Sequence, residues 1–138
     1  MLGNYYFLIQ QYSEAAEEYE KCIKGKNVNP FIKKKFILSL IKQEKFQEAI
    51  HSYYRIITKK DLSIYISSPK SDQIVCRELI EEFTKNTTFL PPEEKHRILG
   101  IIWSFCDSQK SKEHFNLFRK EHKSNRNTIT KITTNKKE

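Results

Sequence analysis

The sequence predicts an all-α fold. Within residues 2–57 the apolar positions recur after 34 residues: Tyr12, Ala15 and Tyr19 are followed by Phe46, Ala49 and Tyr53. Inside each copy the apolar residues keep helical spacing, and the chain has only 3 Gly and 4 Pro with which to build strand-bounding turns. A fixed period of this length predicts stacked supersecondary units, none of which buries its apolar face alone.

The first two helices are predicted to form a hairpin. The first covers about residues 2–10. Ser13 then reads as the N-cap of the second, since its hydroxyl can accept from the free amides of the first turn. The second helix places Ala15, Ala16, Tyr19, Cys22 and Ile23 on one face, and Gly25 reads as the residue just after its end.

The next two helices repeat this arrangement. Asn29-Pro30 predicts the start of the third helix, because the missing amide of Pro30 costs nothing at the first helical position. This helix is apolar nearly all round, which predicts that it is covered on both sides. The fourth helix runs from Phe46 to about Thr58. Such short connections predict antiparallel neighbours.

The register of the repeat is lost after residue 58. Residues 61–72 read as a loop, in which Ile64–Ile66 forms a short extended or helical turn. Asp72 reads as the cap of a fifth helix that ends near Lys85, and a linker leads to Pro92. A sixth helix is predicted over about 92–106 and a seventh over about 109–122, with Asp107 or Ser108 as the cap between them.

Charge and cysteine content bound the class of protein. Of the net charge of +8, an excess of about five lies in residues 117–138, so the basic character belongs mostly to the tail. No apolar stretch approaches the roughly 20 residues that span a bilayer, and the N-terminal sequence lacks the pattern of a signal peptide. We therefore expect a cytoplasmic protein that does not enter a membrane. In that compartment Cys22, Cys76 and Cys106, which form no CxxC pair, are expected to be reduced thiols.

These motifs resemble the tetratricopeptide repeat, a helix-turn-helix unit. Leu2-Gly3 and Tyr6 are similar to the Leu-Gly and Tyr positions of its first helix. Its second-helix pattern is matched by Tyr12, Ala15, Tyr19 and Cys22, and then by Phe46, Ala49 and Tyr53, although Ile37 stands where a small residue is preferred. A third unit at Leu99-Gly100 fits if its turn is one residue shorter, which places Ser111 at the Ala position and Phe115 at the aromatic one.

The resemblance implies one domain over residues 1–123, built as a right-handed superhelix of antiparallel hairpins with about seven helices. Its repeats would cover about 1–29, 30–58 and 92–122, with an insertion at 59–91. Residues 124–138 would form a basic, disordered tail.

The resemblance also implies a concave groove that binds a peptide or a helix. The positions expected to line it are Asn4, Phe7, Leu8, Phe31, Lys34, Leu38, Ile41, Lys42, Arg97, Ile101, Ser104 and Phe105. Such a surface is apolar with three cations, which suits a partner with hydrophobic anchors and acidic character. The chaperone-binding branch of the family clamps a terminal carboxylate, but Lys35 replaces one Asn of that clamp, so a full clamp is not expected.

The sequence favours a non-enzymatic scaffold that binds another protein. His51 and His96 are flanked by polar residues and are expected to be solvated, and no catalytic, phosphate-binding or metal-binding motif appears, so neither a metal nor a cofactor is predicted. An alternative is a helical-repeat protein that binds RNA, which would need a continuous basic face including Lys34, Lys42 and Arg97. Another alternative is a small secretion-type chaperone or a homodimer that pairs through its first helix.

Overall fold

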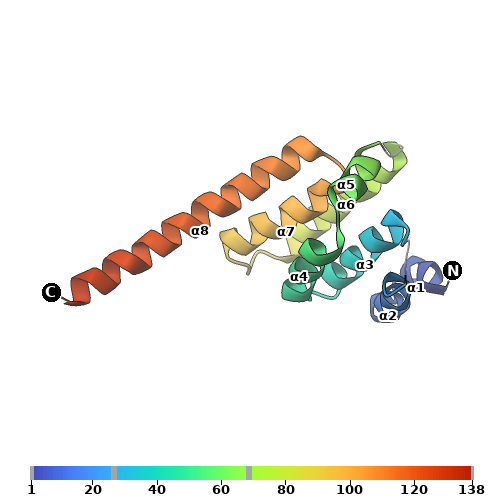
Figure 1. Ribbon diagram of the computed structural model, residues 1–138, viewed down its shortest axis with the longest axis horizontal. Helices are drawn as coiled ribbons and strands as arrows, with labels where there is room; N and C mark the ends of the chain where they lie inside the picture. Colours follow the sequence, from blue (N-terminus) through green and yellow to red (C-terminus); the bar gives the residue numbers. More distant parts are fainter. Residues whose placement is uncertain (1, 26–27, 68–69, 138) are drawn as a thin grey trace. The chain divides into compact units, whose positions relative to one another are not determined.

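The all-α prediction is confirmed. The computed structural model describes residues 2–25, 28–67 and 70–137, without the side chains of residues 70–75 and 124–137. These ranges contain helices only, and no strand. The helices are α1 (Leu2–Leu8), α2 (Tyr12–Ile23), α3 (Pro30–Lys42), α4 (Phe46–Ile56), α5 (Lys59–Ile66), α6 (Lys70–Asn86), α7 (Pro92–Ser104) and α8 (Ser108–Lys137) (Figure 1). The chain divides into an N-terminal unit, Met1–Lys70, and a C-terminal unit, Ser71–Glu138, and each is described by itself.

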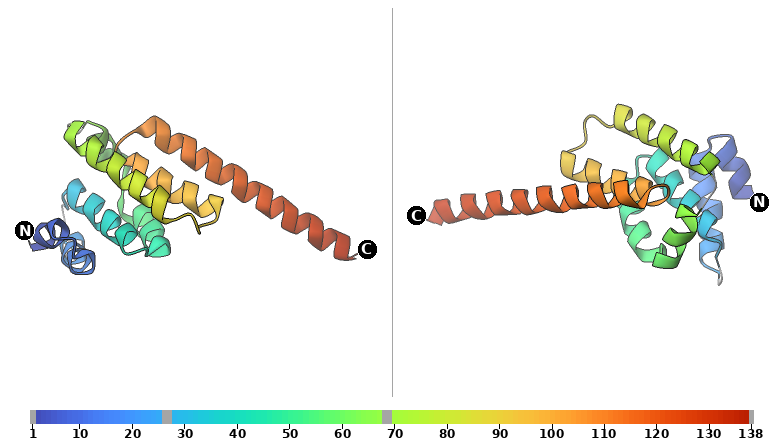
Figure 2. Two further views of the ribbon diagram at one scale, coloured as in Figure 1. Left: turned by 180° about the vertical axis from the view of Figure 1, so that it is seen from behind. Right: turned by 90° about the horizontal axis from the view of Figure 1, so that it is seen from above.

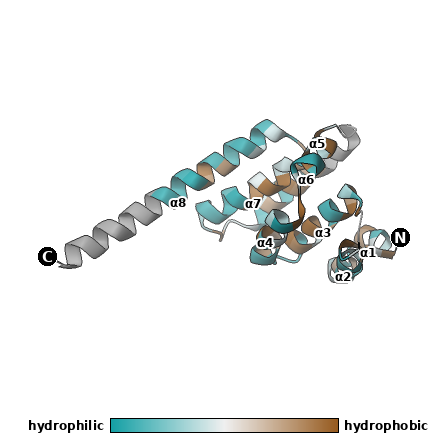
Figure 3. Cartoon of the chain, viewed as in Figure 1, coloured by the Kyte–Doolittle hydropathy of each residue, from teal (hydrophilic) through white to brown (hydrophobic). Residues whose placement is uncertain are grey.

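The N-terminal unit is organised around α3, which packs against α2, α4 and α5. Its start is the predicted one: the side chain of Asn29 accepts from the Phe31 amide at 2.8 Å, and Pro30 is the first helical residue. Six consecutive residues of α3, Phe36–Ile41, are buried, and Figure 3 shows the helix coloured largely hydrophobic. A helix covered on several sides needs apolar residues around most of its circumference, which explains why the sequence of α3 shows no separate polar face.

The turns of the first two hairpins share one strained conformation. Gln10 and Glu44, 34 residues apart, have φ angles of 62° and 60°, in the left-handed region that favours glycine. The amide of Gln11 donates to the Tyr6 carbonyl at 2.9 Å, and the amide of Lys45 donates to the Leu40 carbonyl at 3.0 Å. These bonds close the ends of α1 and α3 in the same way.

This turn corrects the predicted cap of the second helix. The helix begins at Tyr12, and its cap position is Gln11, whose side chain makes no capping hydrogen bond. Only Gln11, which is not helical, separates the left-handed Gln10 from the first helical residue, Tyr12, so Ser13 already lies inside the helix. The prediction of Ser13 as the cap is therefore wrong.

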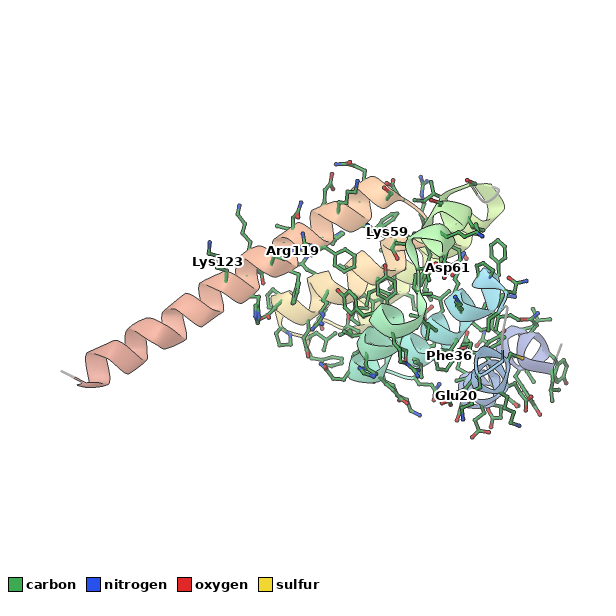
Figure 4. All side chains as sticks on the ribbon, in the orientation of Figure 1. Glu20, Phe36, Lys59, Asp61, Arg119 and Lys123 are labelled. Carbon is green, nitrogen blue, oxygen red and sulfur yellow. A yellow bond between two sulfur atoms is a disulfide. The ribbon has the colours of Figure 1, made fainter. Side chains whose placement is uncertain are left out.

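α5 is a helix where the sequence predicted mainly a loop. The Thr58 hydroxyl accepts from the Asp61 amide at 3.1 Å, and the Asp61 carboxylate accepts from the Thr58 amide at 2.9 Å, so the two residues form a capping box. Tertiary contacts hold α5 on α3: Lys33 Nζ donates to Asp61 Oδ2 at 3.0 Å, and the Tyr65 hydroxyl donates to the Pro30 carbonyl. Figure 4 labels Asp61 on this helix.

The C-terminal unit contains the helical pair α7 and α8, which pack along each other (Figure 2). Asp107 is the cap between them, as one of the two predicted alternatives has it, because its Oδ1 accepts from the amides of Gln109 and Lys110 at 3.0 and 3.2 Å. α8 continues to Lys137, through the segment predicted to be disordered. Residues 124–137 contain neither Pro nor Gly, so nothing in the sequence ends the helix. The predicted cap Asp72 lies outside the residues whose side chains are described.

The prediction of three reduced thiols is wrong for two of the cysteines. Cys76 of α6 and Cys106, after the end of α7, form a disulfide with a Cα–Cα distance of 6.4 Å. Cys22 is a free thiol and is exposed. Because disulfides are rare in reducing compartments, the thiols no longer support the prediction of a cytoplasmic location.

Two glycines allow close helix approaches, one in each unit. A Cβ added to Gly3 would lie 2.9 Å from the Tyr19 ring, and one added to Gly100 would lie 2.8 Å from the Phe115 ring. Ser111, predicted to stand in place of Ala, donates its hydroxyl hydrogen to the Gly100 carbonyl at 2.7 Å. The α1–α2 and α7–α8 pairs therefore use the same contact, a glycine of the first helix against an aromatic ring of the second.

Candidate protein-interaction surface

α1 presents an exposed apolar face. Gly3 of this helix is buried, while Leu2, Tyr5 and Leu8 of the helix and Ile9 directly after it are exposed, Leu8 by 81%. Positions 2, 5 and 9 follow the helical spacing of a single stripe, and position 8 lies beside them. The helix contains no charged residue. We call these four residues the α1 face.

Two lysines of α3 contact residues in or next to α1 that lie outside the α1 face. Lys35 Nζ donates to Asn4 Oδ1 at 3.3 Å and lies 5.9 Å from the centre of the Phe7 ring. Lys42 Nζ lies 5.6 Å from the centre of the Tyr12 ring, just after the end of α1. The side of α1 that carries Asn4 and Phe7 therefore has a positive charge beside it.

Asn4 is held by a hydrogen bond from the buried Tyr19 as well as by one from Lys35. The hydroxyl of Tyr19 donates to Asn4 Oδ1 at 2.7 Å. Burial raises the pKa of Tyr19 to about 12, so this hydroxyl keeps its proton at neutral pH and remains a donor. The Asn4 side chain is thus oriented by two donors at the edge of the α1 face.

The structure separates the predicted groove residues of the N-terminal unit into two sets. Asn4, Leu8 and Phe31 are exposed, and Phe7 and Lys42 are half-buried. Lys34, Leu38 and Ile41 are buried, which corrects the prediction that they line an open surface. The reason lies in the packing of α3: Lys34 Nζ lies 5.9 Å from the centre of the Tyr65 ring of α5, and Phe31 meets the same ring edge-on.

The last four predicted groove residues, three in α7 and Phe105 directly after it, belong to the C-terminal unit. Arg97 is half-buried, with its guanidinium carbon 5.0 Å from the centre of the Phe118 ring. Ile101, Ser104 and Phe105 are buried, and the Ser104 hydroxyl donates to the Ile101 carbonyl at 2.6 Å. These three side chains are not exposed, which again corrects the prediction of an open surface.

A histidine pair between α7 and α8 escaped the sequence analysis. His96 and His114 stack with their ring centres 5.4 Å apart and their Nδ1 atoms 3.1 Å apart. The prediction that His96 is solvated is therefore wrong, whereas His51 is exposed as predicted. The two rings lie on different helices, so no short spacing in the sequence predicts their contact.

The described side chains contain no group of three or more His, Cys, Asp or Glu placed to hold a metal ion. Among the helices described here, none is long and apolar enough to cross a membrane. Comparison of the chain with known protein families, curated proteins and solved structures finds no match.

Proposed function

We propose that the chain is a non-enzymatic protein-interaction module whose α1 face binds an amphipathic helix of a partner protein. The observation that carries this proposal is the exposed stripe of large apolar side chains on a helix without charge. Apolar patches of this kind mark interaction sites on protein surfaces.

The internal 34-residue period supports a helix as the occupant. α3 turns Lys42 and Gln43 toward the preceding helix: Gln43 Nε2 donates to the Tyr12 carbonyl of α2 at 3.2 Å. The residues 34 positions earlier are Leu8, the last residue of α1, and Ile9 directly after it. Apolar residues therefore occupy, at the end of α1, the positions through which the end of α3 contacts the preceding helix.

The charge beside α1 supports an acidic partner. Lys35 lies beside the Phe7 ring of α1 and Lys42 lies beside the Tyr12 ring, and α1 itself carries no charge of either sign. Carboxylates beside the apolar stripe of the partner would meet these lysines and would fix its orientation. An apolar anchor inserted in a groove with charged flanks is a common mode of helix recognition.

Fluorescence anisotropy with two designed helical peptides tests the proposal. Both peptides carry one leucine stripe, flanked by Glu in the first and by Lys in the second. We expect the Glu peptide to bind more tightly, and Leu8→Glu to weaken its binding by about tenfold or more, the effect typical of a central apolar anchor. Leu117→Glu on α8 is the matched control, since Leu117 is also an exposed leucine, by 41%.

Equal binding of the Glu peptide to the Leu8→Glu and Leu117→Glu variants would contradict the proposal. Sedimentation of the unmutated chain tests the alternative occupant. If the chain dimerises and Leu8→Glu makes it monomeric, the α1 face binds a second copy and the partner-helix proposal is rejected.

One of the residues that the nucleic-acid alternative requires on the surface is buried. Its continuous basic face needed Lys34, which is buried beside the Tyr65 ring. No other observation on the described residues favours it over the protein partner.

A further inference from the structure

The His96–His114 pair lies at the centre of a small network between α7 and α8. His96 Nε2 lies 3.6 Å from Glu121 Oε1, and the His96 Nδ1 atom faces His114 Nδ1 at 3.1 Å. Next to the pair, His122 of α8 contacts the carboxylate of Glu93 of α7 and stacks on Phe118. The network therefore joins the two helices that make up the packed pair of the C-terminal unit.

The distance between the two Nδ1 atoms limits how many protons the pair can hold. A hydrogen bond between them needs one nitrogen that carries a proton and one that accepts it. With one positive charge the arrangement is satisfied: His96 donates from Nε2 toward Glu121 and from Nδ1 to His114. With two charges both Nδ1 atoms carry protons, which point at each other between two stacked cations.

We propose that the His96–His114 pair is a pH-sensitive latch, which holds α8 on α7 while at most one ring is charged and loosens this packing when both rings are charged. His114 is half-buried, so solvent does not fully screen the second charge.

The electrostatic surroundings set the direction of the effect. Burial lowers the pKa of His114, and the charge on His96 lowers it further; Lys110 acts in the same direction and Glu113 in the opposite one. A histidine whose pKa in the folded state lies below its unfolded value of about 6.5 stabilises the fold above that pH. The stabilisation is lost as the pH falls below that value, because the unfolded chain then binds more protons.

Two carboxylates oppose this direction. Glu121 attracts a charged His96, and Glu93 attracts a charged His122. Arg97 of α7, one residue from His96, stacks on Phe118 and adds a further positive charge to this side. The latch therefore depends on the second proton of the pair and not on the total charge of the interface, and the variants must separate these contributions.

Urea unfolding at pH 5.0 to 8.0 tests the latch. Trp103 of α7 is the only Trp, and Lys110 Nζ of α8 lies 4.5 Å from the centre of its ring, so its fluorescence reports on the α7–α8 packing. For the unmutated chain we expect the unfolding constant to rise below pH 6.5 by up to about tenfold per pH unit, the limit for one proton. We expect His114→Gln, which does not titrate, to flatten this dependence, and the exposed His51→Gln control to retain it.

An NMR titration of the histidine rings keeps the proposal testable if His114→Gln does not fold. We expect the His114 ring signals to change below pH 6.5, with the α8 amide signals changing in the same step. The proposal is overturned if His114→Gln keeps the pH dependence of the unmutated chain. It is equally overturned if the His114 ring gains its proton with no change in the α8 amides.

Discussion

Replacing Gly100 by Ala tests whether the glycine-to-ring contact limits the approach of α8 to α7. The new Cβ would lie 2.8 Å from Cδ1 and Cε1 of Phe115 and 3.0 Å from its Cγ. Distances this short force the ring to turn or α8 to move outward, and such overpacking costs about 1–3 kcal/mol. Ala in place of Gly within a helix returns about 1 kcal/mol. We expect a net loss in the free energy of unfolding of about 1 kcal/mol.

Far-UV circular dichroism during urea unfolding measures this change. Gly25→Ala is the matched control, because the nearest atom to its added Cβ is the Cys22 carbonyl oxygen at 3.4 Å, an ordinary contact. We expect this control to leave the unfolding midpoint unchanged or slightly raised.

A double variant isolates the contact from the general effect of Ala in a helix. Phe115→Leu removes the ring atoms that the new methyl group meets, so Gly100→Ala should cost less in the Phe115→Leu background than in the unmutated chain. If Gly100→Ala raises the stability of the unmutated chain, the close approach is not a constraint, and the equivalence drawn between the α1–α2 and α7–α8 pairs fails with it.

Two further predictions follow from the turns and the disulfide. Cys106→Ser should destabilise the C-terminal unit by about 3–4 kcal/mol, because the disulfide to Cys76 closes a segment of 30 residues and restricts the unfolded chain; a reducing agent should lower the unfolding midpoint of the unmutated chain equally, and an unchanged midpoint in reducing agent would argue against the bond. Gln10→Gly and Glu44→Gly should each raise the stability of the N-terminal unit by about 0.5–1 kcal/mol, since glycine removes the cost of a left-handed conformation. Gln11→Gly, next to that position, should lower the stability instead, and a stabilising effect there would contradict the assignment.

The sequence predicts well those elements whose ends have local causes. Asn29-Pro30 begins a helix because a side-chain acceptor and a residue without an amide suit that position wherever it lies in the fold. Asp107 acts in the same way before α8. Ser13 had the right chemistry but the wrong position, because the left-handed Gln10 shortens the turn and starts the helix earlier.

Features that depend on distant residues could not be predicted in this way. The disulfide joins two cysteines whose proximity follows from the path between α6 and α7, and no motif marks it. The histidine pair joins residues 96 and 114 across the α7–α8 packing. The third repeat predicted from the sequence has a turn that is one residue shorter than the first two turns. Among the described residues this turn has no left-handed residue equivalent to Gln10 and Glu44, and Asp107 caps the following helix instead.

The groove prediction fails for Lys34 for a reason that also explains the position of the α1 face. In the pattern of equal hairpins, α3 would offer its apolar residues and Lys34 to a ligand. Here the capped helix α5 packs on α3, where the Asp61 carboxylate accepts a hydrogen bond from Lys33 and Tyr65 lies beside Lys34. Burial would raise the pKa of Asp61, but its hydrogen bonds to Thr58 and Lys33 outweigh this and hold the pKa below its usual value, so the carboxylate stays charged and α5 stays paired at neutral pH. Since α3 is covered by a segment of its own chain, the exposed apolar face that we propose for partner binding lies on α1 and not on α3.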